Sequence, residues 1–229
     1  MTFISRAGQK LDHALSVFSL DVGGLICADL GCNAGGFTDC LLQRGAAKVY
    51  AIDTGYGALA WTLRKDPRVV VMERTNAMHA TLPETVAVVC IDVAWTRQRH
   101  ILPAARRLLA PGGTVVTLIK PHYEAERSWL IKGILAAERL NDVVNAVKHD
   151  IDGAGFDVVA MAASPILGGE GNTEVLAQLK VKECESISSI GGLAGGRTIC
   201  RLTSTASNGA YAVSPYSHGG SRFRTFRAA

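Results

Sequence analysis

Four charged residues lie where strands of a sheet are expected to end or begin. Lys10 stands in SRAGQKL, just before the first expected strand, and Asp92 ends the otherwise apolar run VAVVCID. Lys120 ends TVVTLIK, and Glu174 follows a glycine turn at the start of the last expected strand. Ligands in open parallel sheets bind outside the carboxyl ends of the strands. Single charges at strand ends are usually solvated, but two lysines and two acids around one predicted pocket indicate acid–base chemistry.

The segment ADLGCNAGGFTDCLLQ has the pattern of a nucleotide-binding turn, in which an acid ends a strand and a glycine-rich loop opens a helix. The residues concerned are Asp29, Gly31, Gly35, Gly36 and Phe37. Glycines let the backbone approach a ligand closely and adopt positive φ. Asp53 ends the next strand-like run, about 20 residues further on, where an acid can accept both hydroxyls of a ribose. These features predict a site for an adenosine-type ligand.

NAD and S-adenosylmethionine both fit an adenosine site. The spacing Asp-x-Gly-x-x-x-Gly-Gly differs from the G-x-G-x-x-G of dinucleotide-binding proteins. An acid at the strand end can also hold the ammonium group of a ligand. The loop therefore favours S-adenosylmethionine, and an NAD-dependent oxidoreductase is the weaker alternative. A tight turn without any ligand would leave the position of Asp53 unexplained.

Strand-like and helix-like stretches alternate from about residue 10 to about residue 180, which predicts a mostly parallel, doubly wound α/β sheet of Rossmann-like type. The expected strands are 25–31, 48–53, 69–73, 86–92, 114–120, 156–164 and 174–181, and the clearest helices are 37–45, 99–110 and 138–155. The last two strands are joined without a helix, so we expect the last one to be antiparallel. Residues 1–183 form the predicted domain.

Composition describes an ordinary soluble globule, with 48% hydrophobic and 19% charged residues. No apolar run approaches the roughly 18 residues that span a bilayer, and the start lacks a secretory signal. We therefore predict a cytoplasmic protein that does not bind a membrane. The composition carries no signal for an oligomeric state.

The chain has six cysteines, none in a C-x-x-C pair. Buried, reduced thiols are the expected state, and no metal site is predicted. The cysteines are Cys27, Cys32, Cys40, Cys90, Cys184 and Cys200.

Residues 184–229 differ in character, because they are rich in Gly, Ser and Thr and show no amphipathic period. We expect a largely disordered tail. After Glu185 it contains no acid but keeps five arginines. Such a tail could contact RNA phosphates, which would also suit the net charge of +4. A solvated extension without a role is the alternative.

These motifs resemble the FtsJ-like ribosomal RNA 2′-O-methyltransferases, and within them the TlyA-type (haemolysin A-like) proteins. The matching text is SRAGQKL, GGFTDCLLQRGAAKVYAIDTGYGALAWTLRKDPRVVVMERTNA, IDV, LLAPGG, IKP and SPILGGEGNTE, from Ser5 to about Lys182. The resemblance implies a Rossmann-like methyltransferase fold, S-adenosylmethionine as cofactor and ribosomal RNA as partner. TlyA-type proteins also carry a small N-terminal RNA-binding domain, and we expect that domain to be absent here.

The resemblance also implies roles for single residues. The catalytic set of the family falls on Lys10, Asp92, Lys120 and Glu174. The cofactor set falls on Asp29, Gly31, Gly35, Gly36 and Phe37, with Asp53 on the ribose and Asn76 near the adenine. The sequence departs from the family in GCNAGG, in IDVAW and in KPHYE, and it lacks a fuller glycine-rich loop after Glu124. Most of these changes touch the target pocket rather than the cofactor loop.

A ribose hydroxyl is a poor nucleophile that must lose its proton during attack. A lysine serves as base only when its pKa is lowered, which a neighbouring cation and partial burial achieve. We therefore expect Lys120 to be the general base and Lys10 the neighbouring cation, with Asp92 and Glu174 positioning the lysines and the ribose. Two alternatives are a nonenzymatic RNA-binding protein of methyltransferase descent and a membrane-active, haemolysin-like protein.

Overall fold

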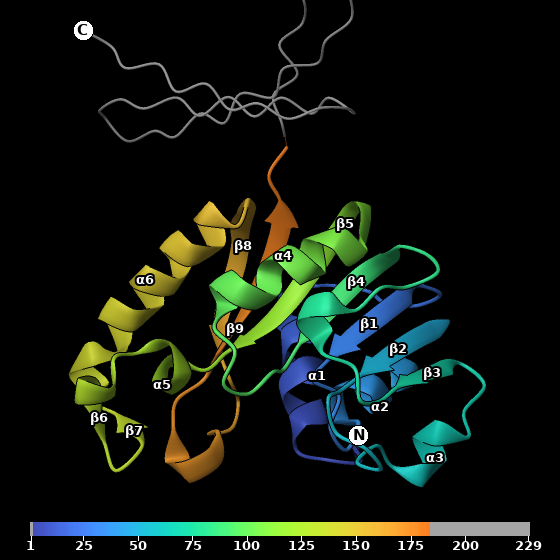
Figure 1. Ribbon diagram of the computed structural model, residues 1–229, viewed down its shortest axis with the longest axis horizontal. Coiled ribbons are helices and arrows are strands. Elements are labelled where there is room, and N and C mark those ends of the chain that lie inside the picture. The colour runs from blue at the N-terminus through green and yellow to red at the C-terminus, as the bar shows by residue number, and fades with distance from the viewer. Residues whose placement is uncertain (1, 184–229) are drawn as a thin grey trace, which may run out of the picture. The chain divides into compact units, whose positions relative to one another are not determined.

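The computed structural model describes residues 2–183, so the predicted tail, its arginines, Cys184 and Cys200 lie outside the described residues. Seven strands form one sheet in the order β3-β2-β1-β4-β5-β9-β8 (Figure 1). Their bounds are β1 Ile26–Leu30, β2 Lys48–Ile52, β3 Val69–Met72, β4 Val86–Ile91, β5 Leu109–Ile119, β8 Phe156–Ala163 and β9 Val175–Val181. β1 to β5 are parallel, and β9 pairs antiparallel with β5 and β8. The predicted sheet with an antiparallel last strand is confirmed.

Helices cover both faces of this sheet. Their bounds are α1 Ala7–Val17, α2 Gly36–Gln43, α3 Trp61–Arg64, α4 Gln98–Leu108, α5 Pro121–Glu124 and α6 Leu140–Gly153. α4 and α6 pack on one face, while α1 and α2 pack on the other (Figure 1). The hairpin of β6 (Leu130–Ile131) and β7 (Ile134–Leu135) and four short 3₁₀ helices complete the described chain; the latter are η1 Ala77–His79, η2 Arg127–Trp129, η3 Ala137–Arg139 and η4 Gly169–Gly171.

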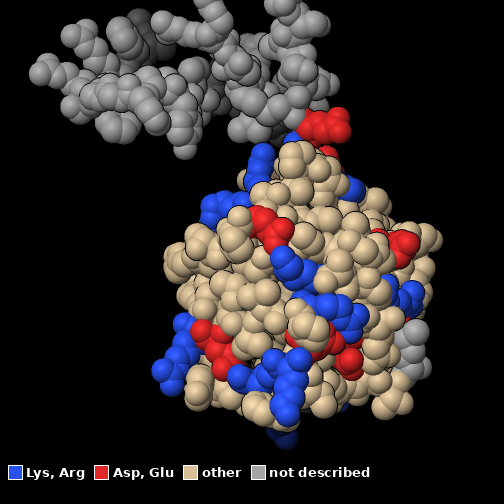
Figure 2. All heavy atoms as spheres, turned by 90° about the vertical axis from the view of Figure 1, so that its right-hand side faces the viewer, with Lys and Arg blue, Asp and Glu red and all other residues tan. Residues whose placement is uncertain are grey.

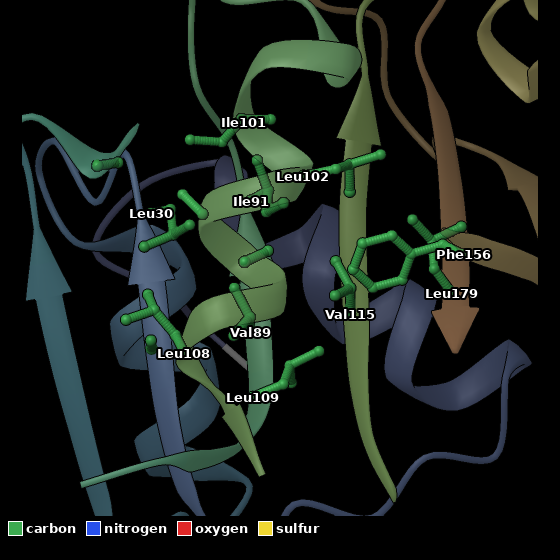
Figure 3. Packing of buried hydrophobic residues seen from close by; sticks show 14 of the residues in the cluster. Leu30, Val89, Ile91, Ile101, Leu102, Leu108, Leu109, Val115, Phe156 and Leu179 are labelled. Atoms are coloured by element: carbon green, nitrogen blue, oxygen red, sulfur yellow. The ribbon is translucent and has the colours of Figure 1, made fainter. Parts of the chain in front are cut away.

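Central strands are buried on both faces, which explains why they read as continuous apolar runs. In β4, Val89 and Ile91 face the layer of α4 and α6, and Val88 and Cys90 face the layer of α1 and α2. Figure 3 shows the first of these layers, where Ile101 and Leu102 of α4 lie over Ile91 and the neighbouring strands. Within residues 2–183, no helix is long and apolar enough to cross a membrane.

The placement of Lys10 just before the first strand is wrong. Lys10 lies inside α1, and further residues separate this helix from β1 at Ile26. Leu11, Ala14 and Leu15 are buried with it, a spacing of three to four residues that marks one face of a helix. This periodicity was the signal for α1, since the apolar face packs against α2 and the sheet.

Two glycines allow α1 and α2 to approach closely. A Cβ at Gly36 would lie 2.9 Å from Ala7 Cβ and 2.9 Å from the Gly8 backbone nitrogen, while a Cβ at Gly8 would lie 2.9 Å from the Gly36 carbonyl oxygen. No side chain fits between the helices at either position. Because α1 carries Lys10, this contact also sets the position of that lysine.

We expect Gly36→Ala to lower the free energy of unfolding by about 1–3 kcal/mol, because the added methyl group must push α1 and α2 apart. Gly153→Ala is the matched control: it lies in α6 with nothing within 4 Å of its Cβ, so it should raise stability by up to about 1 kcal/mol. Urea unfolding followed by circular dichroism measures both. Equal stabilities for the Gly36→Ala variant and the wild type would contradict the packing argument.

Candidate active site

The strand register brings three of the four predicted catalytic residues, Asp92, Lys120 and Glu174, to one edge of the sheet, and helix α1 carries the fourth, Lys10. Ile119 of β5 is paired with Val175 of β9, so Lys120 and Glu174 lie next to each other along adjoining strands. The Asp92 backbone N–H donates to the Leu30 carbonyl oxygen at 2.9 Å, which joins the end of β4 to the start of the glycine loop. The expected meeting of strand ends at the carboxyl edge is therefore observed.

These four residues form two ion pairs. Lys10 Nζ donates a hydrogen bond to Glu174 Oε2, and both side chains are buried. Lys120 Nζ lies 2.6 Å from Asp92 Oδ1, with 15% and 16% of the two side chains exposed. The contact is not aligned as a hydrogen bond, since Asp92 Oδ1 has no hydrogen-bond partner. The second pair is therefore the one that a substrate can reach.

The structure balances the charge of each lysine with a carboxylate. Glu174 neutralises Lys10 from a position 164 residues away in the chain. Removing one member of a buried ion pair leaves an uncompensated charge, which is strongly destabilising. The Lys10–Glu174 pair therefore holds α1 against the start of β9. The prediction that Lys10 acts on Lys120 as a neighbouring cation stays a prediction.

Glu174 is held by the loop that precedes β9. Its backbone carbonyl oxygen accepts from the Ser164 N–H at 3.0 Å. A Cβ at Gly168 would overlap the Glu174 carboxylate, so this glycine permits the approach. Asn172 is 2% exposed, accepts from the Leu135 N–H at 3.1 Å and donates to the Gly133 carbonyl oxygen at 3.0 Å. Asn172 thus ties this loop to the β6–β7 hairpin, a role that sequence reasoning missed.

The glycines of the cofactor loop serve close contacts between chain segments. Gly31 and Gly35 have φ of 89° and 100°, values that L side chains rarely adopt. A Cβ at Gly31 would lie 2.6 Å from the Asp92 carbonyl oxygen, and one at Gly35 would lie 2.7 Å from Leu59 Cδ1. The loop is therefore pressed between the end of β4 and the segment that follows β2.

Asp53 is fixed by two backbone hydrogen bonds. Its Oδ2 accepts from the Asn33 N–H at 2.9 Å, and its Oδ1 accepts from the Gly55 N–H at 2.7 Å. The first bond ties it to the glycine loop. The half-buried carboxylate is thus held at the end of β2 with lone pairs left for a ligand, as the ribose role requires.

Phe37 and Asn76 are placed less favourably for a cofactor. The Phe37 ring is 2% exposed and belongs to the core beside α1, so its backbone is the part that lies at the loop. Asn76 is exposed and caps η1, because its side-chain oxygen accepts from the Met78 N–H at 3.0 Å. The cofactor roles of both residues stay predictions.

Asp29 is fully buried in this structure. Its Oδ2 accepts from the Thr38 hydroxyl at 2.7 Å, and its Oδ1 has no hydrogen-bond partner. Burial raises its pKa to about 7, although hydrogen bonds from the Thr38 hydroxyl and N–H oppose the shift. Thr38 lies in the first turn of α2, whose N-cap Gly35 offers no side chain. Asp29 therefore stabilises the start of α2, and its cofactor role stays a prediction.

The four cysteines of the described residues are free and buried, as expected. Burial raises the pKa of Cys27 and of Cys40 to about 12, so these thiols stay protonated and unreactive.

Two aromatic residues in the segments that carry Asp92 and Lys120 contact each other with their rings tilted by 34°. The ring centroids of Trp95 and Tyr123 are 4.7 Å apart, and Trp95 is 82% exposed. Both lie in the segments IDVAW and KPHYE, where the sequence departs from the resemblance described above.

Two cavities are lined by residues other than the four predicted catalytic residues. One of about 520 Å³ lies between the N-terminal segment, α2 and α3. The other, of about 470 Å³, is lined by residues 56–61 and Arg64, directly after Asp53 in the chain.

Fold and site together define the class of Rossmann-like methyltransferases. The chain belongs to the FtsJ-like methyltransferase family, which matches residues 3–181. This membership confirms the family and the fold class predicted from the sequence.

Individual relatives agree with that assignment. "Putative rRNA methyltransferase YqxC" of Bacillus subtilis is 43% identical, over 78% of this chain and 66% of that protein. "16S/23S rRNA (cytidine-2'-O)-methyltransferase TlyA" of Mycobacterium tuberculosis is 38% identical, over 82% and 72%. A solved structure described as "Putative hemolysin from Streptococcus thermophilus" has a TM-score of 0.77 and 40% identity, over 80% and 68%. The chain thus spans about two thirds of the length of the Bacillus protein.

The raised pKa of Asp29 predicts a pH-dependent stability. Between the ordinary pKa of 3.8 and about 7, the folded chain keeps a proton that the unfolded chain has lost. Stability from this group therefore falls as pH rises towards 7. Asp29→Asn removes the effect, so its stability relative to the wild type should improve by about 2 kcal/mol from pH 5 to pH 7. Urea titrations at both values measure this.

Asp157→Asn is the control, since Asp157 is exposed on β8. Its stability relative to the wild type should be the same at both pH values. If the Asp29→Asn variant behaved like this control, Asp29 would not titrate near neutral pH.

Proposed function

We propose that this chain transfers the methyl group of S-adenosylmethionine to a ribose 2′-hydroxyl of ribosomal RNA. The observation that carries the proposal is the Lys120–Asp92 pair at the carboxyl edge, joined to the glycine loop through the Asp92 backbone. The names of two relatives, "Putative rRNA methyltransferase YqxC" of Bacillus subtilis and "16S/23S rRNA (cytidine-2'-O)-methyltransferase TlyA" of Mycobacterium tuberculosis, support RNA as the substrate.

The residues at this edge fit S-adenosylmethionine. The Asp53 carboxylate is held by two N–H groups in a fixed orientation, so it can accept hydrogen bonds from both ribose hydroxyls of the cofactor. The backbone of Gly31 to Gly35 would lie along its methionine part. When bound, the cofactor supplies a methyl group on a positively charged sulfur, which needs no activation.

Lys120 accepts the hydroxyl proton in this mechanism. If S-adenosylmethionine were bound, it would supply the methyl group to the ribose oxygen. Lys120 Nζ would take the hydroxyl proton as a neutral amine, after releasing to solvent the proton that it carries in the ion pair with Asp92. Asp92 holds that nitrogen in place through the ion pair. Lys10 and Glu174 position the neighbouring strand. Alignment of oxygen, methyl group and sulfur is the main source of rate.

Exposed aromatic rings paired with cations support an RNA partner. Tyr56 is 73% exposed with Arg74 at 4.3 Å from its ring centroid, and Trp61 is 67% exposed with Lys65 at 4.9 Å. Rings on basic surfaces stack on unpaired bases. Figure 2 shows the side of β3 and α3, where Lys and Arg side chains gather over the middle and lower part, with acids between them. The predicted contribution of the tail lies outside the described residues.

The alternatives are less well supported. A protein that had lost catalysis would have no need to keep two lysine–carboxylate pairs, yet both are formed here. The membrane-active alternative is supported mainly by the description of a structural neighbour as a putative hemolysin. We therefore favour the enzyme.

Asp53→Ala should weaken binding of S-adenosylmethionine by about 1–3 kcal/mol, because charge-assisted hydrogen bonds to the ribose are lost. Isothermal titration calorimetry measures the affinity. Glu138→Ala, which changes an exposed carboxylate on η3, is the control and should bind like the wild type. Unchanged affinity in the Asp53→Ala variant would remove Asp53 from the site, and tighter binding of NAD would overturn the methyltransferase proposal.

Lys120→Ala should abolish methyl transfer while cofactor affinity stays nearly intact, since loss of a general base costs about 10²–10⁴ in rate. Lys120→Arg should fail as well, because arginine keeps its proton at working pH. The measurement is transfer of labelled methyl to ribosomal RNA, ribosomal subunits and free transcripts. Lys148→Ala on the exposed side of α6 is the control. An active Lys120→Arg variant would show that this position needs only a positive charge.

A further inference from the structure

Glu124 connects the two segments that carry Asp92 and Lys120. It is the last residue of α5, which begins directly after Lys120. Its Oε1 accepts from the backbone N–H of Gln98 at 2.8 Å. Gln98 is the first residue of α4, and the N-cap residue Arg97 makes no side-chain capping bond. A carboxylate from the neighbouring strand connection therefore caps α4.

Two further hydrogen bonds join the same segments. The Gln98 side chain is 2% exposed, and its Oε1 accepts from the Thr117 hydroxyl of β5 at 2.9 Å. Arg97 Nη2 donates to the Ala125 carbonyl oxygen at 3.4 Å. Gln98 thus connects two elements. Its side chain bonds to Thr117 of β5, and its backbone N–H bonds to Glu124, the last residue of α5.

The Lys120–Asp92 pair is formed between the two segments that these hydrogen bonds join. Asp92 begins the segment that ends at Gln98, and Lys120 lies between Thr117 and Glu124. Trp95 and Tyr123, with ring centroids 4.7 Å apart, add a contact between the two segments. If Glu124 released α4, both the ion pair and this aromatic contact would lose a constraint on their geometry.

We propose that Glu124 is a positioning residue, which by capping α4 holds the segment 92–98 against the segment 117–125 and so orients Lys120 and Asp92. The inference rests on the proposed function, because orientation matters through methyl transfer. A base displaced by about 1 Å loses much of its rate advantage. Glu124 is not a catalytic residue, since it contacts the chain rather than the reacting atoms.

The surroundings of Glu124 make this cap sensitive to acid. Burial raises its pKa to about 6, and the bond from the Gln98 N–H opposes that shift. The charged groups around it are Arg97 and Arg99, which favour the carboxylate, and Asp150 of α6, which disfavours it; His122 lies on α5 itself. The negative charge of the carboxylate also interacts favourably with the positive end of the helix dipole at the N-terminus of α4. Ionisation of Glu124 as pH rises through about 6 therefore strengthens the cap.

Glu124→Ala and Glu124→Gln separate positioning from mere stability. Glutamine keeps an oxygen that accepts the Gln98 N–H but does not titrate. We expect kcat for methyl transfer to fall about 10-fold or more in Glu124→Ala with little change in the KM for cofactor, and to fall less than about 3-fold in Glu124→Gln at pH 8. The rise of kcat through about pH 6 should be present in the wild type and absent in Glu124→Gln. Glu126→Ala, an exposed neighbour, is the control.

A second measurement does not depend on activity. The chain has three tryptophans, so Trp61→Phe with Trp129→Phe leaves Trp95 as the reporter of the segment 92–98. Time-resolved fluorescence anisotropy of Trp95 should show a larger fast component in Glu124→Ala but not in Glu124→Gln.

The two measurements distinguish the ways in which these ideas can fail. If the wild type methylates no RNA, the proposed function fails. The Trp95 anisotropy is then the test of whether Glu124 positions the segment 92–98. Unchanged anisotropy in Glu124→Ala overturns it. So does a wild-type kcat per folded molecule in Glu124→Ala, or a Glu124→Gln variant as impaired as Glu124→Ala.

Discussion

The site depends on the hydrogen-bond register between β5 and β9. Parallel strands alone would bring Asp92 and Lys120 to the carboxyl edge, but Glu174 lies at the amino end of its own strand. Because β9 runs antiparallel, its start falls at the same edge, and the pairing of Ile119 with Val175 sets Glu174 beside Lys120. A slip of one residue would turn the β9 side chains to the opposite faces of the sheet. The Lys10–Glu174 ion pair, and with it the position of α1, follows from this register.

Each of the four charged residues at this edge has a partner of opposite charge. A buried ion pair often contributes little net stability, because desolvation offsets the attraction. The Lys10–Glu174 pair therefore makes more sense as a constraint on geometry, since it fixes a helix against a strand end. The Lys120–Asp92 pair is more exposed, as a pair that meets a substrate must be.

Two carboxylates from outside the helices stabilise the helix starts that border the site. Asp29 of β1 bonds to Thr38 in α2, and Glu124 of α5 bonds to Gln98 in α4. Neither helix has a side-chain cap from its own N-cap residue. Burial raises the pKa of both acids, to about 7 and about 6. Neutral pH is thus where the loops beside the site are most sensitive to proton binding.

The sequence by itself determined the α/β sheet, the glycine loop, Asp53 and the strand-end positions of Asp92 and Lys120. These features follow from local patterns, because apolar runs mark buried strands and their ends share one edge. The tertiary structure decided which lysine meets which acid, since Lys10 and Glu174 are 164 residues apart. It also decided that the Phe37 ring points into the core, and that Asn172 and Glu124 brace the site. Each of these depends on contacts between distant segments, for which the local sequence carries no periodic signal.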